Sequence, residues 1–361
     1  MISARFESGP SAPVDDHAAE PCPADDGPRP DRVVAAHSDR PGARLAFTVI
    51  ELLIAIAIIA ILAALLLPAV NAALFGGRQT QAIAEITAME KALIDFKSEY
   101  GVYPPSQISL HDDLGSYFSP TNPLGLMGTN LRNRDASLRA IRRVWPAFDA
   151  ASIPTLDFNN DGDADDIDDI VDLSGAEALV FFLGGMRESY APSGTGLGFT
   201  PIGFGVVPST PFTQTLTGNR KQFFEFNPEQ LIDADGDNLP EYRDPLTDDG
   251  RVPYVYFSAY EGAGYVPTEN ITATYAVLPY YRGLSGGVPV LPYNDETFQI
   301  ISPGADQDFG DGGVYSPEGG LQSPDALDDA NSRATNATEA EKRQRAEQDN
   351  LVNFGNFVLS N

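Results

Sequence analysis

The strongest hydrophobic pattern in the chain is one apolar run from Phe47 to Val70, in which Glu51 is the only charged residue. The run has 24 residues, so as a helix it is about 36 Å long, enough to cross a bilayer core of about 30 Å. A carboxylate inside a membrane segment raises the free energy of insertion unless a positively charged group pairs with it. The run therefore predicts a transmembrane helix, and a cut just before Phe47 would supply a free α-amino group as the partner of Glu51.

Beyond this run, apolar residues continue at spacings of three and four, which form one stripe on a helix. The stripe consists of Ile83, Ile86, Met89, Leu93, Phe96 and Tyr100. Gly101 follows as a stop signal, and Pro104-Pro105 cannot continue a helix. We therefore expect one helix from Phe47 to Tyr100, about 80 Å long, with a kink or break near Pro68 or Gly76-Gly77.

The segment Phe47-Thr48-Val49-Ile50-Glu51-Leu52-Leu53 resembles the amino terminus of type IV prepilin-like proteins, which are the pilins and the type II secretion pseudopilins. The resemblance implies that a prepilin peptidase cuts between Ala46 and Phe47 and methylates the new amino group of Phe47. It also implies that Glu51 pairs with this amino group on a neighbouring subunit during filament assembly. Pro68 lies where the family commonly has a proline, whereas Ala46 replaces the usual Gly.

Two other interpretations of the apolar run stand beside this one. A plain signal-anchor helix has the same hydropathy, and a secretory signal peptide could be cut after the small residues Val70-Asn71-Ala72. A signal peptide has an apolar region of roughly 7–15 residues, and the run here is longer and contains Glu51. The residues around Phe47 therefore favour prepilin processing.

Later segments resemble the major type II secretion pseudopilin. These segments are Lys91–Pro105, Asp244–Tyr256, Phe298–Asp306 and Asn350–Phe354. The resemblance implies a pilin-like α+β fold. Its long N-terminal helix, hydrophobic and then amphipathic, packs on a small antiparallel sheet and projects from the globular head. Residues 106–225 exceed what small major pseudopilins contain, so we expect a large loop-rich insertion, with a helix around Ala136–Arg143 and a helical or buried segment at Ala176–Leu183.

The expected organisation has five parts. Residues 1–46 are a cleaved leader rich in Pro, Asp, Ala and Arg, and 47–77 are the transmembrane and assembly half of the helix. Residues 78–105 are its amphipathic half, and 106–225 are the insertion. Residues 226–361 are the antiparallel sheet and the C-terminal loops of the globular head, in which the polar stretch 323–348 is expected to be a flexible loop.

The segment Asp157–Asp168 has the oxygen spacing of an EF-hand-type calcium loop. Its candidate ligands at positions 1, 3, 5, 7, 9 and 12 are Asp157, Asn159, Asp161, Asp163, Asp165 and Asp168. Gly162 at position 6 permits the sharp turn that such a loop needs, and the Asp at position 12 resembles a dockerin repeat. Because the carboxylates would repel one another without a cation, we expect structural calcium here. A solvated acidic turn is the alternative.

A second acidic loop follows in the C-terminal half of the chain. Its candidate ligands are Asp233, Asp235, Asp237, Glu241 and Asp244. Gly236 is at position 4 instead of 6, so the geometry must differ from that of an EF-hand. A third and looser candidate is Asp306–Asp311, where major pseudopilins hold calcium. In each loop the expected role of calcium is structural, because binding an ion can order a loop that has few apolar groups.

The net charge and the scarcity of cysteine and histidine exclude several classes of function. The net charge is −28, and removing residues 1–46, with five Arg and eight acidic residues, leaves −25. This acidity argues against nucleic acid or anionic lipid headgroups as partners. The only cysteine is Cys22, in the leader, and the only histidine after the leader is His111, which we expect at the surface beside Asp112-Asp113. These residues offer no catalytic triad or thiol nucleophile, so we do not expect an enzyme.

The first functional hypothesis is a structural subunit of a type IV pilin-like or type II secretion pseudopilus filament. Its expected partners are further copies of itself, other pilin-like subunits, a prepilin peptidase and an inner-membrane assembly platform. Arg40 and Arg44 before the apolar run suit the cytoplasmic side, which predicts a single-pass protein of the bacterial inner membrane with its head outside the cytoplasm. The alternative is a membrane-anchored, extracytoplasmic binding module stabilised by calcium.

Overall fold

The computed structural model describes thirteen stretches of the chain, and every structural statement below concerns them. They are residues 48–153, 156–158, 170–187, 200–213, 218–247, 252–260, 264–266, 270, 277–285, 288–310, 313–316, 320–322 and 350–354. The predicted leader, Phe47 and the polar stretch 323–348 lie outside them. The chain divides into two compact units, residues 1–61 and 62–361. The described part of the first unit is helical, and all the described strands belong to the second, so the fold is α+β.

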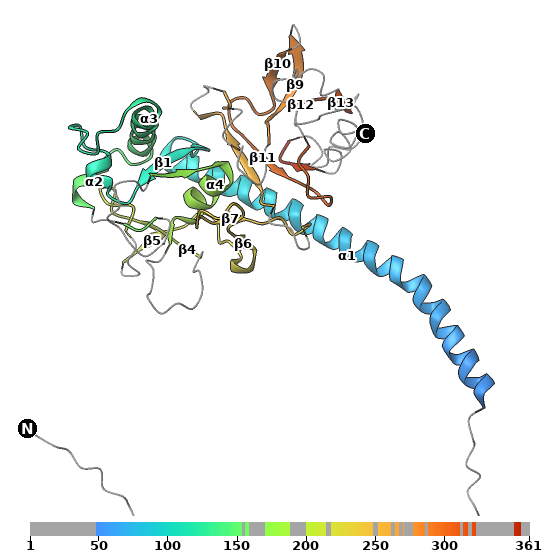
Figure 1. Cartoon of the computed structure of the whole chain (residues 1–361). Coiled ribbons are helices and arrows are strands. Elements are labelled where there is room, and N and C mark those ends of the chain that lie inside the picture. The colour runs from blue at the N-terminus through green and yellow to red at the C-terminus, as the bar shows by residue number, and fades with distance from the viewer. Residues whose placement is uncertain are drawn as a thin grey trace, which may run out of the picture. The chain divides into compact units, whose positions relative to one another are not determined.

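α1 (Val49–Tyr100) is one continuous helix of 52 residues (Figure 1). At its C-terminal end Gly101 adopts a φ of +81°, which glycine tolerates without strain, and its amide donates a hydrogen bond to the Lys97 carbonyl at 2.7 Å. The predicted helix is therefore confirmed to its last residue. The helix continues through Pro68 and Gly76-Gly77, so the break that we considered there does not occur.

The second half of α1 packs against a three-stranded antiparallel sheet with the order β14-β11-β8. The strands are β8 (Val255–Ser258), β11 (Phe298–Ser302) and β14 (Leu351–Val352). The buried α1 side chains are Ala82, Ile86, Met89, Ala92, Leu93 and Phe96. All but Phe96 share a core cluster with Tyr256, Phe298 and Ile300, while Val255, Phe257 and Ile301 point into another cluster on the opposite face. Because successive strand residues alternate in direction, both faces of this sheet are buried.

α4 (Gly175–Gly184) is a helix buried along its whole length, so the segment Ala176–Leu183, expected to be helical or buried, is both. Leu179, Val180 and Leu183 pack in the same cluster as α1, whereas Phe181 and Phe182 belong to a separate cluster. The N-terminus of α4 lies very close to β8: a Cβ placed on Gly175 would be 2.1 Å from the Tyr256 carbonyl oxygen. The helix is therefore fixed between α1 and the sheet.

The remaining strands form small sheets around this core (Figure 1). β1 (Ile108–His111) pairs with β2 (Ile170–Leu173), and β6 (Leu231–Ile232) pairs with β7 (Glu241–Tyr242). A three-stranded sheet has the order β3-β4-β5, from β3 (Met186–Arg187), β4 (Pro201–Gly205) and β5 (Arg220–Lys221). A fourth group has the order β10-β9-β12-β13, from β9 (Tyr280–Ser285), β10 (Val288–Pro292), β12 (Gly313–Ser316) and β13 (Gly320–Gln322). These pairings are antiparallel except that of β9 with β12.

Four shorter helical segments complete the described elements. They are α2 (Leu114–Tyr117), α3 (Gly128–Val144), η1 (Ala150–Ser152) and η2 (Pro228–Gln230). α3 contains the predicted helical segment Ala136–Arg143 but begins eight residues earlier.

His111 contradicts its predicted place at the surface. Its side chain is only 2% exposed and stacks on the ring of Tyr117 at a centroid distance of 5.6 Å. The Nδ1 atom of His111 accepts a hydrogen bond from the Asp113 amide at 2.9 Å. The polar neighbours in the sequence misled the prediction, because burial here comes from β1 packing beneath α2 and α3.

Candidate functional site

The start of α1 is the first place where chemistry was predicted. Ala46 and Phe47 lie outside the described residues, but Thr48 and Glu51 are described. The Glu51 carboxylate accepts hydrogen bonds from the Thr48 amide at 2.9 Å and from the Thr48 hydroxyl at 2.8 Å. The Glu51 amide in turn donates to the Thr48 hydroxyl at 3.3 Å. The two residues therefore form a reciprocal capping box at the helix N-terminus.

The helix that follows this cap is apolar and uncovered. Every side chain from Val49 to Phe75 is exposed, including large ones such as Ile59 and Leu65. Within the described part of the chain, α1 is the one helix whose length and composition would let it cross a membrane. The predicted transmembrane segment is confirmed to that extent.

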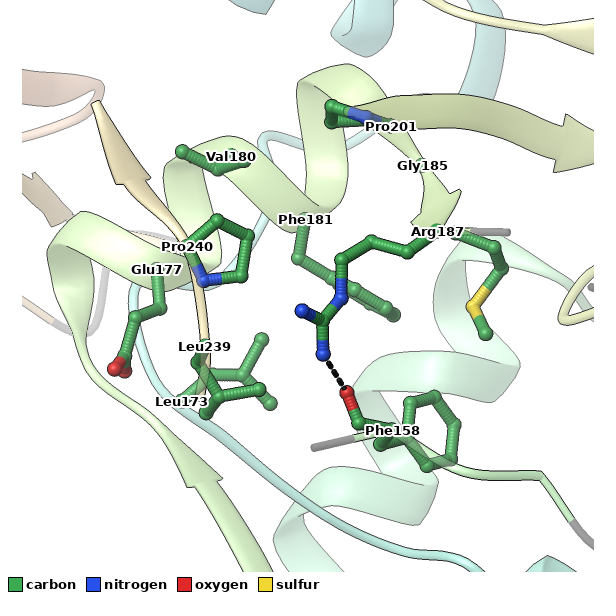
Figure 2. Close-up of a pocket in the computed structure, with 11 residues that line it drawn as sticks. Phe158, Leu173, Glu177, Val180, Phe181, Gly185, Arg187, Pro201, Leu239 and Pro240 are labelled. Carbon is green, nitrogen blue, oxygen red and sulfur yellow. Dashed lines mark hydrogen bonds between the residues drawn. The ribbon is translucent and has the colours of Figure 1, made fainter. Parts of the chain in front are cut away.

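The first acidic loop is described only at its start. Asp157 is buried, and the other predicted ligands, Asn159, Asp161, Asp163, Asp165 and Asp168, lie outside the described residues. A buried arginine, Arg187 of β3, donates a hydrogen bond to the Phe158 carbonyl (Figure 2). Burial lowers the pKa of Arg187 to about 10, and the negative charges of Asp157, Asp237 and Asp233 act in the opposite direction. The start of the first loop therefore lies close to the second loop.

The second acidic loop is the turn between β6 and β7. The carboxylate of Asp233 accepts hydrogen bonds from the amides of Gly236 at 2.6 Å and Asn238 at 3.3 Å. Asp237 accepts one from the Leu239 amide at 2.8 Å. Gly236 has a φ of +90°, so a residue with a side chain would be strained there. These hydrogen bonds hold the loop in a tight turn.

Five carboxylates gather at this loop in two overlapping groups. One oxygen each from Asp233, Asp235 and Asp237 lie within 4.8 Å of one another. The same holds for Asp235, Glu241 and a residue that the sequence did not indicate, Glu177 of α4. The structure thus brings together four of the five predicted ligands of this loop and adds one from a helix far away in the sequence.

Glu177, Asp235 and Glu241, here called the inner group, are poorly satisfied; the two glutamates are buried and Asp235 is half-buried. Glu177 is 2% exposed and Glu241 is fully buried. One oxygen of Glu177 accepts a hydrogen bond from the Ser174 amide, and one oxygen of Glu241 accepts one from the Ala234 amide at 2.7 Å. The other oxygen of each, together with Oδ1 of Asp235, is buried and finds no hydrogen-bond donor among the described residues. Buried oxygens without a hydrogen-bond donor are uncommon in folded proteins, so these three need an explanation.

Electrostatics around these carboxylates is unfavourable. The pKa of Glu241 is raised to about 9, mainly by burial and further by the charges of Glu177, Asp235 and Asp237, while the hydrogen bond from Ala234 acts in the opposite direction. The pKa of Glu177 is also raised well above its usual range, first by burial and then by the charge of Asp237. The group is therefore stable only if protons or a cation neutralise it.

Figure 2 shows Glu177, one of these carboxylates, together with the buried Arg187. Glu177 and Arg187 line the same pocket with Leu239 and Pro240, but the guanidinium turns to Phe158 on one side while the carboxylate of Glu177 lies on the other.

Asp244, the last predicted ligand of the loop, has a different place. It is fully buried, and its carboxylate accepts hydrogen bonds from the Leu246 amide at 2.7 Å and from the Ser302 hydroxyl of β11. It does not belong to either carboxylate group described above.

In the third candidate loop, Asp306 and Asp308 accept hydrogen bonds from the amides of Asp308 and Gly310, each at 3.0 Å. Asp311 lies outside the described residues. The described acids of this loop form no group of three that could hold an ion.

Comparisons of the chain with protein-family models, with curated proteins and with solved structures find no match. Its function is therefore inferred from its own residues and their geometry.

Proposed function

We propose that this chain is a structural subunit of a type IV pilin-like or type II secretion pseudopilus filament. In this proposal a prepilin peptidase cuts between Ala46 and Phe47, and the mature chain is assembled from the bacterial inner membrane with its head outside the cytoplasm. The observation that carries the proposal is the division of α1 into two halves with opposite surroundings. The same proposal includes a pilin-like fold for this chain, with an enlarged globular head.

The two halves of α1 differ in what covers them. From Ala82 to Phe96 the helix buries one face in the core of the head. From Val49 to Phe75 its side chains are exposed and, apart from Glu51 and Asn71, apolar on all sides. An uncovered apolar surface of this length needs lipid or other apolar helices around it. A filament subunit uses both in turn, because its helix leaves the bilayer and packs against the helices of neighbouring subunits.

Glu51 has two possible roles, and the capping box makes the choice testable. Its hydrogen bonds with Thr48 explain the acid as a helix cap, which needs an acceptor oxygen but no charge. Pairing with the amino group of Phe47 on a neighbouring subunit needs the negative charge itself. In an apolar filament core, an ion pair of this kind stabilises correct register and penalises a subunit without it.

The alternative function is a membrane-anchored binding module that keeps α1 in the bilayer and uses its head outside the cytoplasm. The capping box favours this alternative to the extent that Thr48 already provides hydrogen bonds for the Glu51 carboxylate within one chain. For such a module, any residue that caps the helix equally well should replace Glu51 without loss.

The deciding experiment is Glu51→Gln in cells that assemble the filament. Gln preserves the acceptor oxygen of the capping box and removes the charge. We expect the variant to be inserted and cleaved normally but to be incorporated into filaments poorly, as measured in sheared filament fractions against total membrane protein. Thr48→Val is the matched control, since it removes the side-chain cap but leaves the charge, and it should assemble. Normal incorporation of Glu51→Gln would contradict the proposed pairing and favour the anchored module.

A further inference from the structure

The inner carboxylate group raises a question that filament assembly does not answer. Glu177, Asp235 and Glu241 come from α4, from the β6–β7 turn and from β7, and their oxygens lie within 4.8 Å of one another. Each has a buried oxygen that no described donor satisfies. Three like charges held this close repel one another strongly, and burial makes the repulsion worse. Some positive species must lie among them when the head is folded.

We propose that these three carboxylates bind one calcium ion that fastens α4 to the β6–β7 turn. Glu177 is the ligand that defines the site, because it belongs to no acidic loop, has a buried unsatisfied oxygen and places a carboxylate oxygen within 4.8 Å of oxygens from Asp235 and Glu241. The site is therefore built across the fold and does not follow the twelve-residue ligand spacing of an EF-hand.

The number of carboxylates favours calcium over magnesium. Calcium takes six to eight oxygen ligands in a flexible geometry, whereas magnesium usually keeps several waters and is bound through one or two carboxylates. Three carboxylates meet here, with oxygens within 4.8 Å of one another. The partly exposed Asp233 and the exposed Asp237 continue the group toward solvent through the shared Asp235. They give the ion an entry path and further oxygens, and calcium takes six to eight.

Existing hydrogen bonds hold the ligands in place. The second oxygen of Glu177 accepts from the Ser174 amide at the start of α4, and the second oxygen of Glu241 accepts from the Ala234 amide. Each glutamate therefore has one oxygen that orients it and one that is available to the ion. An ion bound here joins a helix packed on α1 to a turn with few apolar side chains of its own.

Two explanations other than calcium are open to test. Protons could neutralise the group, in which case it would not take up metal. Arg187 could balance the charge, although the carboxylates that act on it most are Asp157, Asp237 and Asp233. The variants Glu177→Gln and Glu241→Gln separate these explanations, because Gln preserves the oriented acceptor and removes the charge.

The experiment uses the full-length protein in detergent, freed of metal with a chelator and titrated calorimetrically at neutral pH with calcium chloride or magnesium chloride. We expect the wild type to take up calcium in preference to magnesium and to unfold at a higher temperature with calcium than with chelator. Trp145, the only tryptophan and a buried one, reports the unfolding. Glu177→Gln and Glu241→Gln should each weaken one binding event by at least about tenfold, since loss of even an outer-shell partner costs that much.

Two controls assign the binding event. Glu229→Gln changes an exposed glutamate just before β6 and should bind calcium like the wild type. Asp161→Asn changes the other acidic loop and should leave this event intact. No calcium uptake by the wild type, or uptake that is unchanged in both glutamate variants, would overturn the site. Equal uptake of magnesium would overturn its assignment to calcium. If one glutamate variant fails to fold, the other decides the assignment.

Discussion

Glu51 and Glu177 begin from the same local sequence pattern and end in opposite surroundings. Each is the only acid in an apolar helical stretch, and each follows a Thr or Ser by three residues, as in a capping box. The Glu51 carboxylate is exposed and bonded to Thr48, whereas Glu177 is buried with one oxygen unsatisfied. A capping signal therefore predicts where a helix starts but not what else its acid does.

The difference also indicates where each missing partner comes from. Glu51 becomes costly only when lipid or neighbouring helices surround it, so we propose that its partner belongs to another chain. Glu177 is already buried in the folded head, so we propose that its partner is an ion from solution.

The largest expected change in stability comes from comparing a leucine in the buried half of α1 with one in the exposed half. Leu93 is fully buried beside Leu179 and Val180 of α4, while Leu62 is 53% exposed. Leu93→Ala should lower the free energy of unfolding of the head by roughly 2–5 kcal/mol, because it leaves a cavity. Leu62→Ala should change it by less than about 0.5 kcal/mol. Urea unfolding followed by Trp145 fluorescence measures both, and equal effects would refute the division.

A smaller effect tests how tightly α4 is held. Gly175→Ala places a methyl group against the Tyr256 carbonyl oxygen and should destabilise the head by roughly 1–3 kcal/mol. Gly77→Ala has no atom within 4 Å of the added methyl and should stabilise α1 by roughly 0.5–1 kcal/mol. Thermal unfolding followed by circular dichroism shows whether each variant is less or more stable than the wild type. A harmless Gly175→Ala would mean that α4 is not fixed against β8.

A third effect concerns pH in the absence of calcium, and it is small for a change of one pH unit. The pKa of Glu241 is about 9 in the folded head, against an ordinary value of 4.5, so the folded state holds a proton that the unfolded state has lost. Stability from this group is therefore complete below about pH 4.5 and is lost as the pH rises toward 9, at up to about 1.4 kcal/mol per pH unit.

Chelator-treated protein should accordingly unfold more easily as the pH is raised through this range, and Glu241→Gln should flatten the dependence. Glu229→Gln serves as the control and should follow the wild type. Added calcium should restore more stability at the upper end of the range than at the lower end, because the ion favours the ionised carboxylates. A pH profile of the chelated wild type that matches that of Glu241→Gln would show that Glu241 is not buried with a raised pKa.

The sequence predicted those features whose signals are local. The long apolar run and the stripe from Ile83 to Tyr100 have the helical period over many turns, and α1 followed them to its end. The segment that forms α4 was predicted to be helical or buried because a short apolar run ends at two glycines. The start of α3 was missed because its first turns, near Gly128 to Asn133, are polar and show no apolar stripe.

Features that depend on contacts between distant segments could not be predicted in the same way. The close spacing of Asp233, Asp235 and Asp237 is visible in the sequence, but nothing there indicates that Glu177 lies beside them. The one available signal was a lone acid in the otherwise apolar segment Gly175–Gly184. His111 was placed wrongly for the same reason, since its burial under Tyr117 is decided by tertiary packing.

The central claim is that the chain enters a filament as a processed subunit, and the mature N-terminus tests it most directly. The protein should be purified from the membranes of cells that contain a prepilin peptidase, and its terminal peptide identified by mass spectrometry. We predict a chain that begins at N-methylated Phe47, with residues 1–46 removed. An intact leader, or a cut after Ala72, would contradict the account.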